Sequence, residues 1–300
     1  MRYIFGPVPS RRFGLSLGID IIPSKYCTLD CIYCQIGRTT KLTLQRKKYV
    51  AIQPVLDELK KVLKSKIKID CLTFSGSGEP TLNSNIGKMI SEVKKITQMP
   101  IVVITNGTLL YRLDVQNDLL EADIVAPSLD AILSFQKINR PHKSLEIKKI
   151  IDGLVKFRKI YKGKIWLEVM FVKNVNDSTQ DIKAVKKATE RIKPDRIHLN
   201  TVVRPPLETY AKPLEQKKML AIRKIFGKNC EIISGRIKDE LKPICTNIQQ
   251  KILEILKRRP MQLEDILAII ESDKKTVLKE LWILERKKLI SENNGWWVIV

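Results

Sequence analysis

Short apolar runs rich in β-branched residues recur along residues 15–202, and longer amphipathic stretches separate them. Each run is nearly continuous in apolar character, which is typical of a strand buried on both faces of a parallel sheet. The alternation restricts the chain to an α/β fold, because parallel strands need a crossover between them, usually a helix. It predicts six strands, at residues 15–22, 69–74, 101–105, 123–127, 165–172 and 196–202.

The stretches between these runs have apolar residues three and four positions apart, with Lys on the outer face. Right-handed βαβ connections then place the strands in one parallel sheet. The periodicity leaves two architectures open, a sheet partly closed into a barrel and an open doubly wound sheet. The predicted helices are residues 55–63, 86–96, 145–160, 182–192 and 214–226.

The pattern changes after residues 234–247, a weakly patterned segment that we interpret as a linker. Helices are predicted at residues 248–256 and 263–270, and a third runs from the cap Asp273 to about Lys287. Asn293-Asn294-Gly295 then predicts a hairpin turn. Three helices and a hairpin indicate a small winged helix at residues 248–300, beside a larger domain at residues 1–233.

Charge and composition limit the class of protein. With 55 Lys and Arg against 32 Asp and Glu, the net charge is +23, and residues 246–300 contribute only ten basic and eight acidic groups. The basic surface therefore belongs mainly to the larger domain and favours a nucleic acid as partner. A merely solvated Lys-rich surface is the alternative. We expect no membrane span and no signal peptide, and hence a cytoplasmic protein with reduced thiols.

Three of the six cysteines follow the first strand closely. Cys27, Cys31 and Cys34 are spaced C-x3-C-x2-C, so one short loop can bring three thiolates to one inorganic core. Thiolates are the ligands of iron–sulfur clusters, and three of them leave one iron of a [4Fe–4S] cluster open for another ligand. A structural zinc site is the alternative, but neither histidine of the chain lies near this loop in the sequence.

The chain resembles the radical S-adenosylmethionine (radical SAM) enzymes in this cysteine motif and in Tyr33, the aromatic residue just before its last cysteine. Gly76-Ser77-Gly78-Glu79, at the end of the second strand, is similar to the Gly-Gly-Glu motif that contacts the methionine amino group in that family. Glycines allow close approach of the backbone, and the Glu79 carboxylate can accept hydrogen bonds from an ammonium. A dinucleotide-binding loop does not fit, since no third glycine opens a helix.

The resemblance covers residues 10–233 and implies a partial (β/α)6 barrel, with its site at the carboxyl ends of the strands. Several polar residues lie at the carboxyl ends of the later strands or within these strands. The residues expected to bind S-adenosylmethionine, besides Tyr33 and the Gly76–Glu79 segment, are Asn106, Ser128, Asp130, Glu168 and Asn200. Ordinary turns and helix caps also favour such residues, and that interpretation stays open.

The resemblance also implies a reaction. An electron donor would reduce the cluster, and S-adenosylmethionine on the open iron would be cleaved to methionine and a 5′-deoxyadenosyl radical. The radical would abstract hydrogen from an unidentified substrate, with RNA and protein as candidates. This step needs no acid or base from the chain, and we assign no catalytic residue. The alternative is a winged-helix regulator whose Fe–S cluster senses redox state without catalysis.

Three segments, at residues 7–18, 74–82 and 198–206, resemble uncharacterised Fe–S oxidoreductases grouped with the tRNA wyosine-base synthases. Those synthases carry a second cluster on cysteines upstream of the triad, and residues 1–26 contain none. We interpret the other cysteines as buried or incidental thiols, so wyosine synthesis itself is not expected. They are Cys71, Cys230 and Cys245.

Substrate contacts are expected from basic residues on loops at the open rim. Arg140 and His142 lie on one such loop and Arg204 on another, and Arg suits bidentate binding of phosphate or carboxylate. Arg12 precedes the first strand and is expected on the opposite side of the barrel. His198, inside a strand, is interpreted as a core residue with its hydrogen bonds satisfied. The winged helix is expected to recruit a nucleic acid or protein partner.

Overall fold

Eight strands form one curved sheet in the computed structural model, which describes residues 3–65, 67–233, 248–270 and 272–300. The strand order is β1-β2-β5-β6-β7-β8-β9-β10, and neighbours are parallel except for the antiparallel pair β1 and β2. The bounds are β1 Ile4–Ser10, β2 Gly14–Ile19, β5 Cys71–Phe74, β6 Ile101–Thr105, β7 Ile124–Pro127, β8 Lys164–Phe171, β9 Arg196–Thr201 and β10 Cys230–Ile232.

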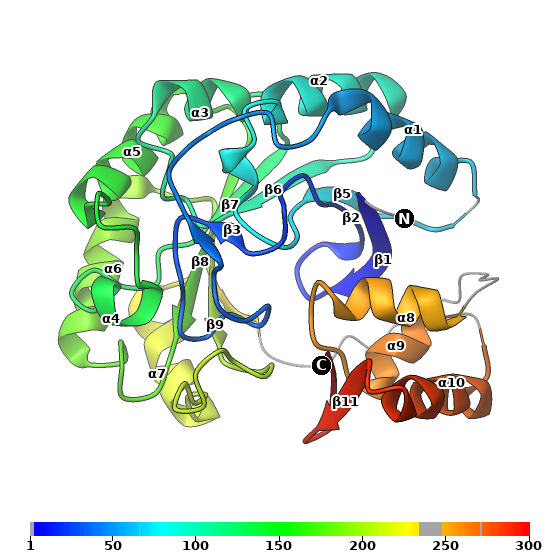
Figure 1. The fold of residues 1–300 in the computed structure, drawn as a ribbon. Helices are drawn as coiled ribbons and strands as arrows, with labels where there is room; N and C mark the ends of the chain where they lie inside the picture. The colour runs from blue at the N-terminus through cyan, green and yellow to red at the C-terminus, as the bar shows by residue number, and fades with distance from the viewer. Residues whose placement is uncertain (1–2, 66, 234–247, 271) are drawn as a thin grey trace.

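Helices cover the outer face of this sheet (Figure 1). All five helices predicted for the larger domain are confirmed, with ends that differ by a few residues. Together with the parallel strands they form the expected partial barrel. Their bounds are α1 Ile52–Leu63, α2 Ile86–Ile96, α5 Ile147–Ile160, α6 Thr179–Ile192 and α7 Gln216–Phe226, and the shorter α3 Leu113–Asp118 and α4 Phe135–Asn139 lie between them.

All six predicted strands are present, and β8 shows how the barrel is filled. Its residues alternate between full burial and partial exposure. Leu167 and Val169 are fully buried, whereas Glu168 on the same strand is half-buried. Because successive side chains of a strand point to opposite faces, Glu168 lies on the interior face of the sheet.

Two further strands of the sheet, β1 and β10, were not expected. Pro7 and Pro9 argue against a strand at residues 4–10, yet prolines are tolerated on an edge strand, where one side forms no ladder. β10 is only three residues long and pairs with β9. A short pair, β3 Tyr26–Cys27 and β4 Lys41–Leu42, frames the cysteine loop.

The C-terminal residues form three helices and a hairpin, as the sequence pattern indicates. α8 Ile248–Leu256, α9 Leu263–Ile269 and α10 Lys274–Arg286 precede the hairpin of β11 Ile290–Asn293 and β12 Trp296–Ile299. Asp273 caps α10 by accepting from the Thr276 amide, and Asn294 and Gly295 have the positive φ of a tight hairpin turn. We call residues 248–300 the C-terminal module; its winged-helix assignment and the domain bounds remain predictions.

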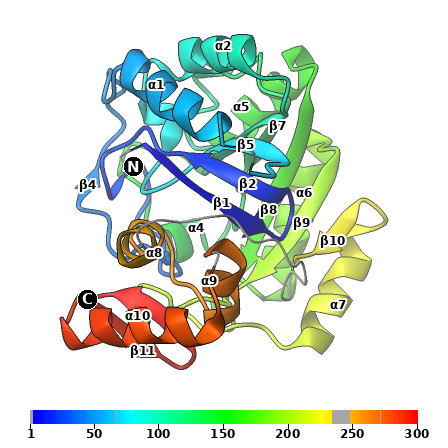
Figure 2. The same ribbon diagram turned by 90° about the vertical axis from the view of Figure 1, so that its right-hand side faces the viewer.

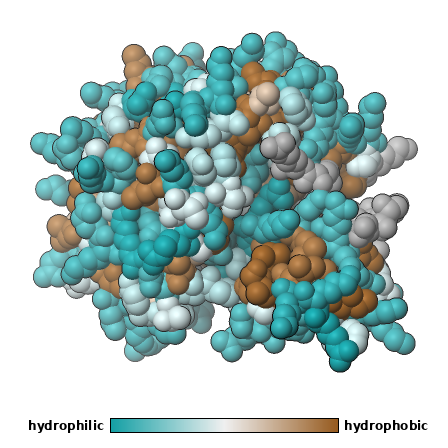
Figure 3. Space-filling view, in the orientation of Figure 1, coloured by the Kyte–Doolittle hydropathy of each residue, from teal (hydrophilic) through white to brown (hydrophobic). Residues whose placement is uncertain are grey.

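The C-terminal module packs on β1, as Figures 1 and 2 show. Phe5 and Val8 of β1 share one apolar cluster with Ile252, Ile266 and Leu281 of the module. Apolar side chains also gather on the surface of the module, beside a mostly hydrophilic barrel face (Figure 3). The predicted linker, residues 234–247, lies outside the described residues. No described helix has both the length and the apolar character that a membrane span requires.

Candidate cluster and cofactor site

The cysteine loop follows β3 and is held by its own backbone and by helix α4. The Cys34 amide donates to the Cys31 carbonyl at 3.0 Å, which closes a turn between these two ligand candidates. The Ile32 amide donates to the Ile138 carbonyl at 3.0 Å, and the Asp30 amide donates to the Asn139 carbonyl in the same way. The loop is therefore braced against the end of α4, and all three thiols are half-buried and free.

The glycine motif supports the same loop from the side of β5. Gly76 has a φ of +154°, and a Cβ there would lie 2.3 Å from the Asp20 carboxyl carbon. A Cβ on Gly78 would lie 2.1 Å from the Tyr26 carbonyl oxygen, directly before Cys27. Only glycine permits these approaches, and one function of the motif is therefore to position the cysteine loop.

Glu79 is buried, and four donors of the chain surround its carboxylate. Its Oε1 accepts from the Thr81 amide at 3.0 Å and from the Thr81 and Thr105 hydroxyls at 2.6 Å. Its Oε2 accepts from the Asn106 amide at 2.7 Å. Burial raises the pKa of this carboxyl, and the hydrogen bonds oppose that rise. Glu79 thus joins the ends of β5 and β6, and contact with an ammonium stays a prediction.

Asp130 also anchors the cysteine loop, through Tyr33 and Asn139. It is buried and accepts hydrogen bonds from the Tyr33 hydroxyl, from Asn139 Nδ2 at 2.7 Å and from the Met170 amide at 2.9 Å. Burial raises its pKa. Tyr33 is therefore an anchor between the cysteine loop and the end of β7, and direct cofactor contact by either residue remains a prediction.

Two side-chain amides point at cysteine sulfurs. Asn106 Nδ2 lies 3.5 Å from Cys27 Sγ and 2.7 Å from Thr28 Oγ1. Asn139 Nδ2 lies 3.4 Å from Cys31 Sγ. Sequence reasoning selected Asn106 as a cofactor contact but did not select Asn139. Nothing in the sequence around Asn139 indicates a contact with the cysteines, because only the folded structure brings the end of α4 next to Cys31.

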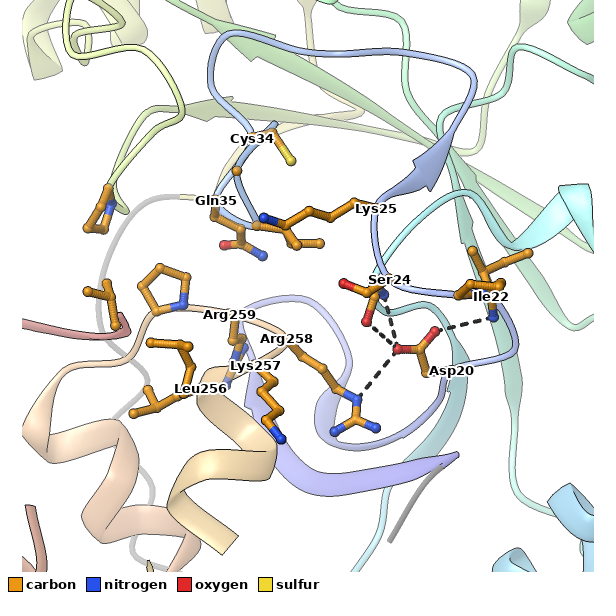
Figure 4. Close-up of a pocket in the computed structure, with 18 of the residues that line it drawn as sticks. Asp20, Ile22, Ser24, Lys25, Cys34, Gln35, Leu256, Lys257, Arg258 and Arg259 are labelled. Atoms are coloured by element: carbon orange, nitrogen blue, oxygen red, sulfur yellow. Dashed lines mark hydrogen bonds and ion pairs between the residues drawn. The ribbon is translucent and has the colours of Figure 1, made fainter. Parts of the chain in front are cut away.

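Two cavities adjoin the loop. The inner cavity, about 290 Å³, contains Cys27, Gly76, Gly78, Glu79, Asn106 and Ser128 in its wall. The outer cavity, about 680 Å³, lies between the cysteine loop and the C-terminal module, with Asp20, Lys25, Cys34 and Arg258 in its wall (Figure 4). Gln35, Arg258 and Arg259 line both, so the cavities meet at these side chains.

Of the remaining predicted residues of the strands, only Ser128 lines the inner cavity. Ser128 lines the cavity and bridges to Glu168 of β8. Glu168 pairs with Arg12, whose guanidinium enters the interior from the β1–β2 turn. The expectation that Arg12 lies on the opposite side of the barrel is therefore wrong, because its side chain reaches into the inner cavity. Asn200 is buried, and its Oδ1 has no hydrogen-bond partner in the described structure.

The three predicted substrate residues separate into two groups. Arg204 lines the inner cavity, and its Nη1 donates to Gln35 Oε1 at 2.8 Å. Arg140 instead pairs with Glu208 at 2.6 Å, and its guanidinium also donates to the Tyr210 hydroxyl. His142 Nδ1 accepts from the Ser144 amide. Neither Arg140 nor His142 lines the inner or the outer cavity, so the structure brings only Arg204 to the site.

His198 is buried, as expected, but its hydrogen bonds are not satisfied. Its Nδ1 has no partner among the described residues, and its ring packs edge-on against Trp166. Burial lowers its pKa to about 4, and the nearby charges of Arg12 and Arg196 add to this effect. The sequence pattern shows that the residue is in a strand but not that its neighbours are cationic and apolar.

A protein-family comparison agrees with this geometry. The family described as the radical SAM superfamily matches residues 21–202, which is more than half of the chain. The chain belongs to the radical SAM superfamily. It is therefore a member of an enzyme family that uses a [4Fe–4S] cluster and S-adenosylmethionine.

Relatives of this radical SAM protein extend the match beyond that segment. A UPF0026 protein of Methanocaldococcus jannaschii is 38% identical over 274 residues, which cover 89% of this chain and 85% of that protein. A protein of Brachyspira hyodysenteriae named GTPase Obg is 39% identical over 295 residues, 96% of this chain. The chain spans only 42% of the length of that relative. The chain thus also belongs to the UPF0026 family.

The fold of this radical SAM protein is similar to that of a solved member. The crystal structure of a radical SAM methyltransferase from Sphaerobacter thermophilus superposes with a TM-score of 0.55 at 15% identity. The match covers 72% of this chain and 65% of that one. At this identity the likeness concerns the fold alone.

The residues of the radical SAM loop fit a cluster. Burial raises the pKa of the Cys27 thiol to about 12, and it also raises the pKa of Cys31 and Cys34. A bound metal displaces such protons, because only the thiolate is a ligand. The described part of the chain has no group of three His, Cys, Asp or Glu placed for a single metal ion, and the fit therefore rests on the donors. These are three free thiols of one loop, two with an amide donor at the sulfur.

Proposed function

We propose that this protein cleaves S-adenosylmethionine reductively and directs the resulting radical at a substrate in the outer cavity. When bound, a [4Fe–4S] cluster on Cys27, Cys31 and Cys34 supplies one electron, and methionine and a 5′-deoxyadenosyl radical are formed. The observation that carries the proposal is that the cysteine loop and the glycine motif line the same cavity. Cys27, Gly76 and Gly78 all line that inner cavity.

The chain supplies placement and exclusion of water. Asn106 and Asn139 orient Cys27 and Cys31 through their amides, and such hydrogen bonds to sulfur tune the potential of a cluster. Gly76 and Gly78 let this segment lie close against Asp20 and Tyr26, and its backbone carbonyls would accept hydrogen bonds from the ammonium of S-adenosylmethionine. Ser128 lines the same cavity, and in this proposal the adenosine end lies beside it.

The test compares two cysteine variants with the parent protein. Protein reconstituted with iron and sulfide without oxygen, given dithionite and S-adenosylmethionine, should release 5′-deoxyadenosine, detected by chromatography. C31A should lose both the Fe–S absorbance and the product. C230A is the matched control, since Cys230 is buried in β10, outside the walls of both cavities. Parent protein with an intact cluster and no 5′-deoxyadenosine would contradict the proposal.

The redox-sensing regulator gives a different result in the same experiment. A sensor would form the cluster and show no spectral change when S-adenosylmethionine is added, because it needs no site for the sulfonium compound. Binding of S-adenosylmethionine to an open iron changes the electronic spectrum of the cluster. Spectra with and without S-adenosylmethionine therefore separate the enzyme from the sensor.

The substrate and partners are proposed on weaker grounds, namely charge. The net charge of +23 favours an anionic partner, and RNA remains a predicted substrate or partner, with protein as the alternative. The grouping with the wyosine-base synthases is likewise a prediction. Lys274, Lys275 and Lys279 are exposed on α10, where a nucleic acid could contact the module. Affinity for RNA that is independent of salt would contradict this proposal.

A further inference from the structure

Four arginines from three separate parts of the chain line the inner cavity. Arg12 comes from the β1–β2 turn and Arg204 from the loop after β9. Arg258 and Arg259 come from the C-terminal module, just after α8. Glu79 is the one carboxylate among the described residues that line this cavity, and its oxygens are already bound by donors of the chain.

Two of the four arginines have a carboxylate partner. Arg12 pairs with Glu168. Arg258 Nε lies 3.5 Å from Asp20 Oδ2 (Figure 4). Its guanidinium also stacks over the Phe5 ring, with 4.7 Å from Cζ to the ring centroid. Both pairs are largely buried, and each balances its own charge within the site. They bind the turn before β2 and the C-terminal module to the barrel.

Arg204 and Arg259 lack such a partner. Neither forms an ion pair within the described ranges, and the Nε of each is buried without a hydrogen-bond acceptor there. Among the described residues, Arg204 donates only to Gln35, a neutral amide. Asp265 of α9 is the acidic side chain whose charge acts on Arg259 most strongly. Most native buried polar groups find a partner, so two guanidiniums with open donors in one cavity call for an explanation.

Burial without a carboxylate partner in the described part of the chain makes the charged forms of Arg204 and Arg259 less favourable, and their pKa values are lowered accordingly. Burial lowers the pKa of Arg204 to about 9 and that of Arg259 to about 10. The charge of Arg259 lowers the pKa of Arg204 further, and the charge of Arg11 lowers both values. Both groups remain protonated at neutral pH. Both side chains are half-buried, so each charge is only partly hydrated, and an anion of the ligand would offset the cost of that lost hydration.

The cofactors do not supply that anion. A cluster on three thiolates is net negative and S-adenosylmethionine is net positive, so the two offset each other next to the cysteine loop. The excess of positive charge at Arg204 and Arg259 is left for the substrate. Two guanidinium forks suit a group with several oxygens and a charge near −2, which describes a terminal phosphate.

We propose that Arg204 and Arg259 together bind the terminal phosphate of a small-molecule phosphate ester, the substrate of the proposed radical reaction. This inference rests on the proposed function. Arg204 lines the inner cavity and Arg259 lines both cavities, so the phosphate would lie where the two meet. The outer cavity of about 680 Å³ would then hold the rest of the substrate. A chain of nucleic acid fits less well, because its internal phosphates carry a single charge and would have to enter a buried site.

The proposal gives the C-terminal module a place in the active site. Arg259 belongs to the module and Arg204 to the barrel, and neither part alone presents both guanidiniums. The module therefore completes the substrate pocket in addition to any role in recruiting a partner. Its packing against β1 through Phe5 and Val8 is what sets the position of Arg259.

The first experiment measures binding of pyrophosphate and inorganic phosphate to the full-length, cluster-reconstituted protein by calorimetry, at constant ionic strength. R204Q and R259Q should each weaken binding about tenfold or more, since each removes charge-assisted hydrogen bonds. R286Q is the charge-matched control, because Arg286 is exposed on α10 and lies over Trp282, outside the cavity. Equal binding by all four proteins would overturn the proposal.

The second experiment measures thermal unfolding without phosphate. Loss of an uncompensated buried charge should leave the melting temperature of R204Q and R259Q unchanged, or raise it by about 2–4 °C. A fall in both melting temperature and phosphate affinity would show that these arginines hold the structure, and would overturn the proposal. Because the readout needs no S-adenosylmethionine, a failure here is distinct from a failure to form 5′-deoxyadenosine.

A competition arm separates the small molecule from nucleic acid. A single-stranded RNA oligonucleotide without terminal phosphates is titrated into the same proteins. We expect its affinity to be unaffected by R204Q and R259Q. If RNA binds the parent protein more tightly than pyrophosphate does, and both variants lose that binding, the anion is a phosphodiester and the small-molecule proposal is wrong.

Discussion

Charged groups in two regions around the inner cavity differ in how completely the chain supplies their hydrogen-bond partners. Beside the cysteine loop, Glu79 in the cavity wall and Asp130, which anchors Tyr33, are buried carboxylates with every oxygen bound by donors of the chain. On the side of the C-terminal module, Arg204 and Arg259 are half-buried cations, and the buried Nε of each has no hydrogen-bond partner among the described residues. Satisfied groups fix the geometry of a site, whereas unsatisfied groups are stable only when a ligand completes them.

The strongest test of this contrast removes a satisfied carboxylate. D130A leaves the Tyr33 hydroxyl, the Asn139 amide and the Met170 amide without their acceptor. We expect the free energy of unfolding to fall by about 3–5 kcal/mol, measured by urea denaturation. The control is D152A, since Asp152 pairs with Arg191 at the surface, where both side chains are at least 40% exposed. Similar losses in both variants would show that Asp130 is not an anchor.

The next largest effect concerns pH and His198 of β9, whose Nδ1 has no hydrogen-bond partner among the described residues. His198 has a pKa of about 4 in the folded protein, below its ordinary value of 6.5. The unfolded chain therefore binds the extra proton first, and stability is lost as the pH falls from about 6.5 to about 4. The loss from this group is about 3 kcal/mol.

The measurement is urea unfolding of the parent protein and H198F at pH 7 and at pH 4.5. The phenyl ring of the variant cannot titrate, so its fall in stability should be smaller than that of the parent by most of that amount. The variant keeps an aromatic ring next to Trp166. An identical fall in the two proteins would assign the acid sensitivity to other groups.

The smallest effect concerns the fine adjustment of the cluster. N139A removes the amide that lies 3.4 Å from Cys31 Sγ. A hydrogen bond stabilises the more negative, reduced state, and its loss of about 1 kcal/mol should lower the reduction potential by about 40 mV. Redox titration of the reconstituted protein gives the value. N293A, on the exposed hairpin, is the control, and an unchanged potential in N139A would deny Asn139 this role.

The sequence predicted much of the fold because local patterns carry that information. The β-branched runs identified six strands, and the spacing of apolar residues identified the helices. β1 was not predicted because its prolines argue against a strand unless the strand lies at an edge. The position of an edge is a property of the sheet as a whole, and no local pattern reports it.

The cysteine loop and the glycine motif could also be identified from the sequence, because each is a short segment whose residue types and spacing indicate its chemistry. The arginine group could not. Arg12 and Arg259 are separated by most of the chain, and nothing in either segment distinguishes them from the many exposed basic residues. Arg140 and Arg204 looked alike in sequence, yet one pairs with Glu208 and the other enters the cavity.

By itself, then, the sequence determined the α/β class, the six parallel strands and the three thiols of the cluster loop, because these depend on residues close together in the chain. The tertiary structure alone decided which charges are paired. Whether a guanidinium meets a carboxylate depends on how β1, the loop after β9 and the C-terminal module meet in space. Folding paired Arg12 and Arg258 there and left Arg204 and Arg259 without a carboxylate within the described residues.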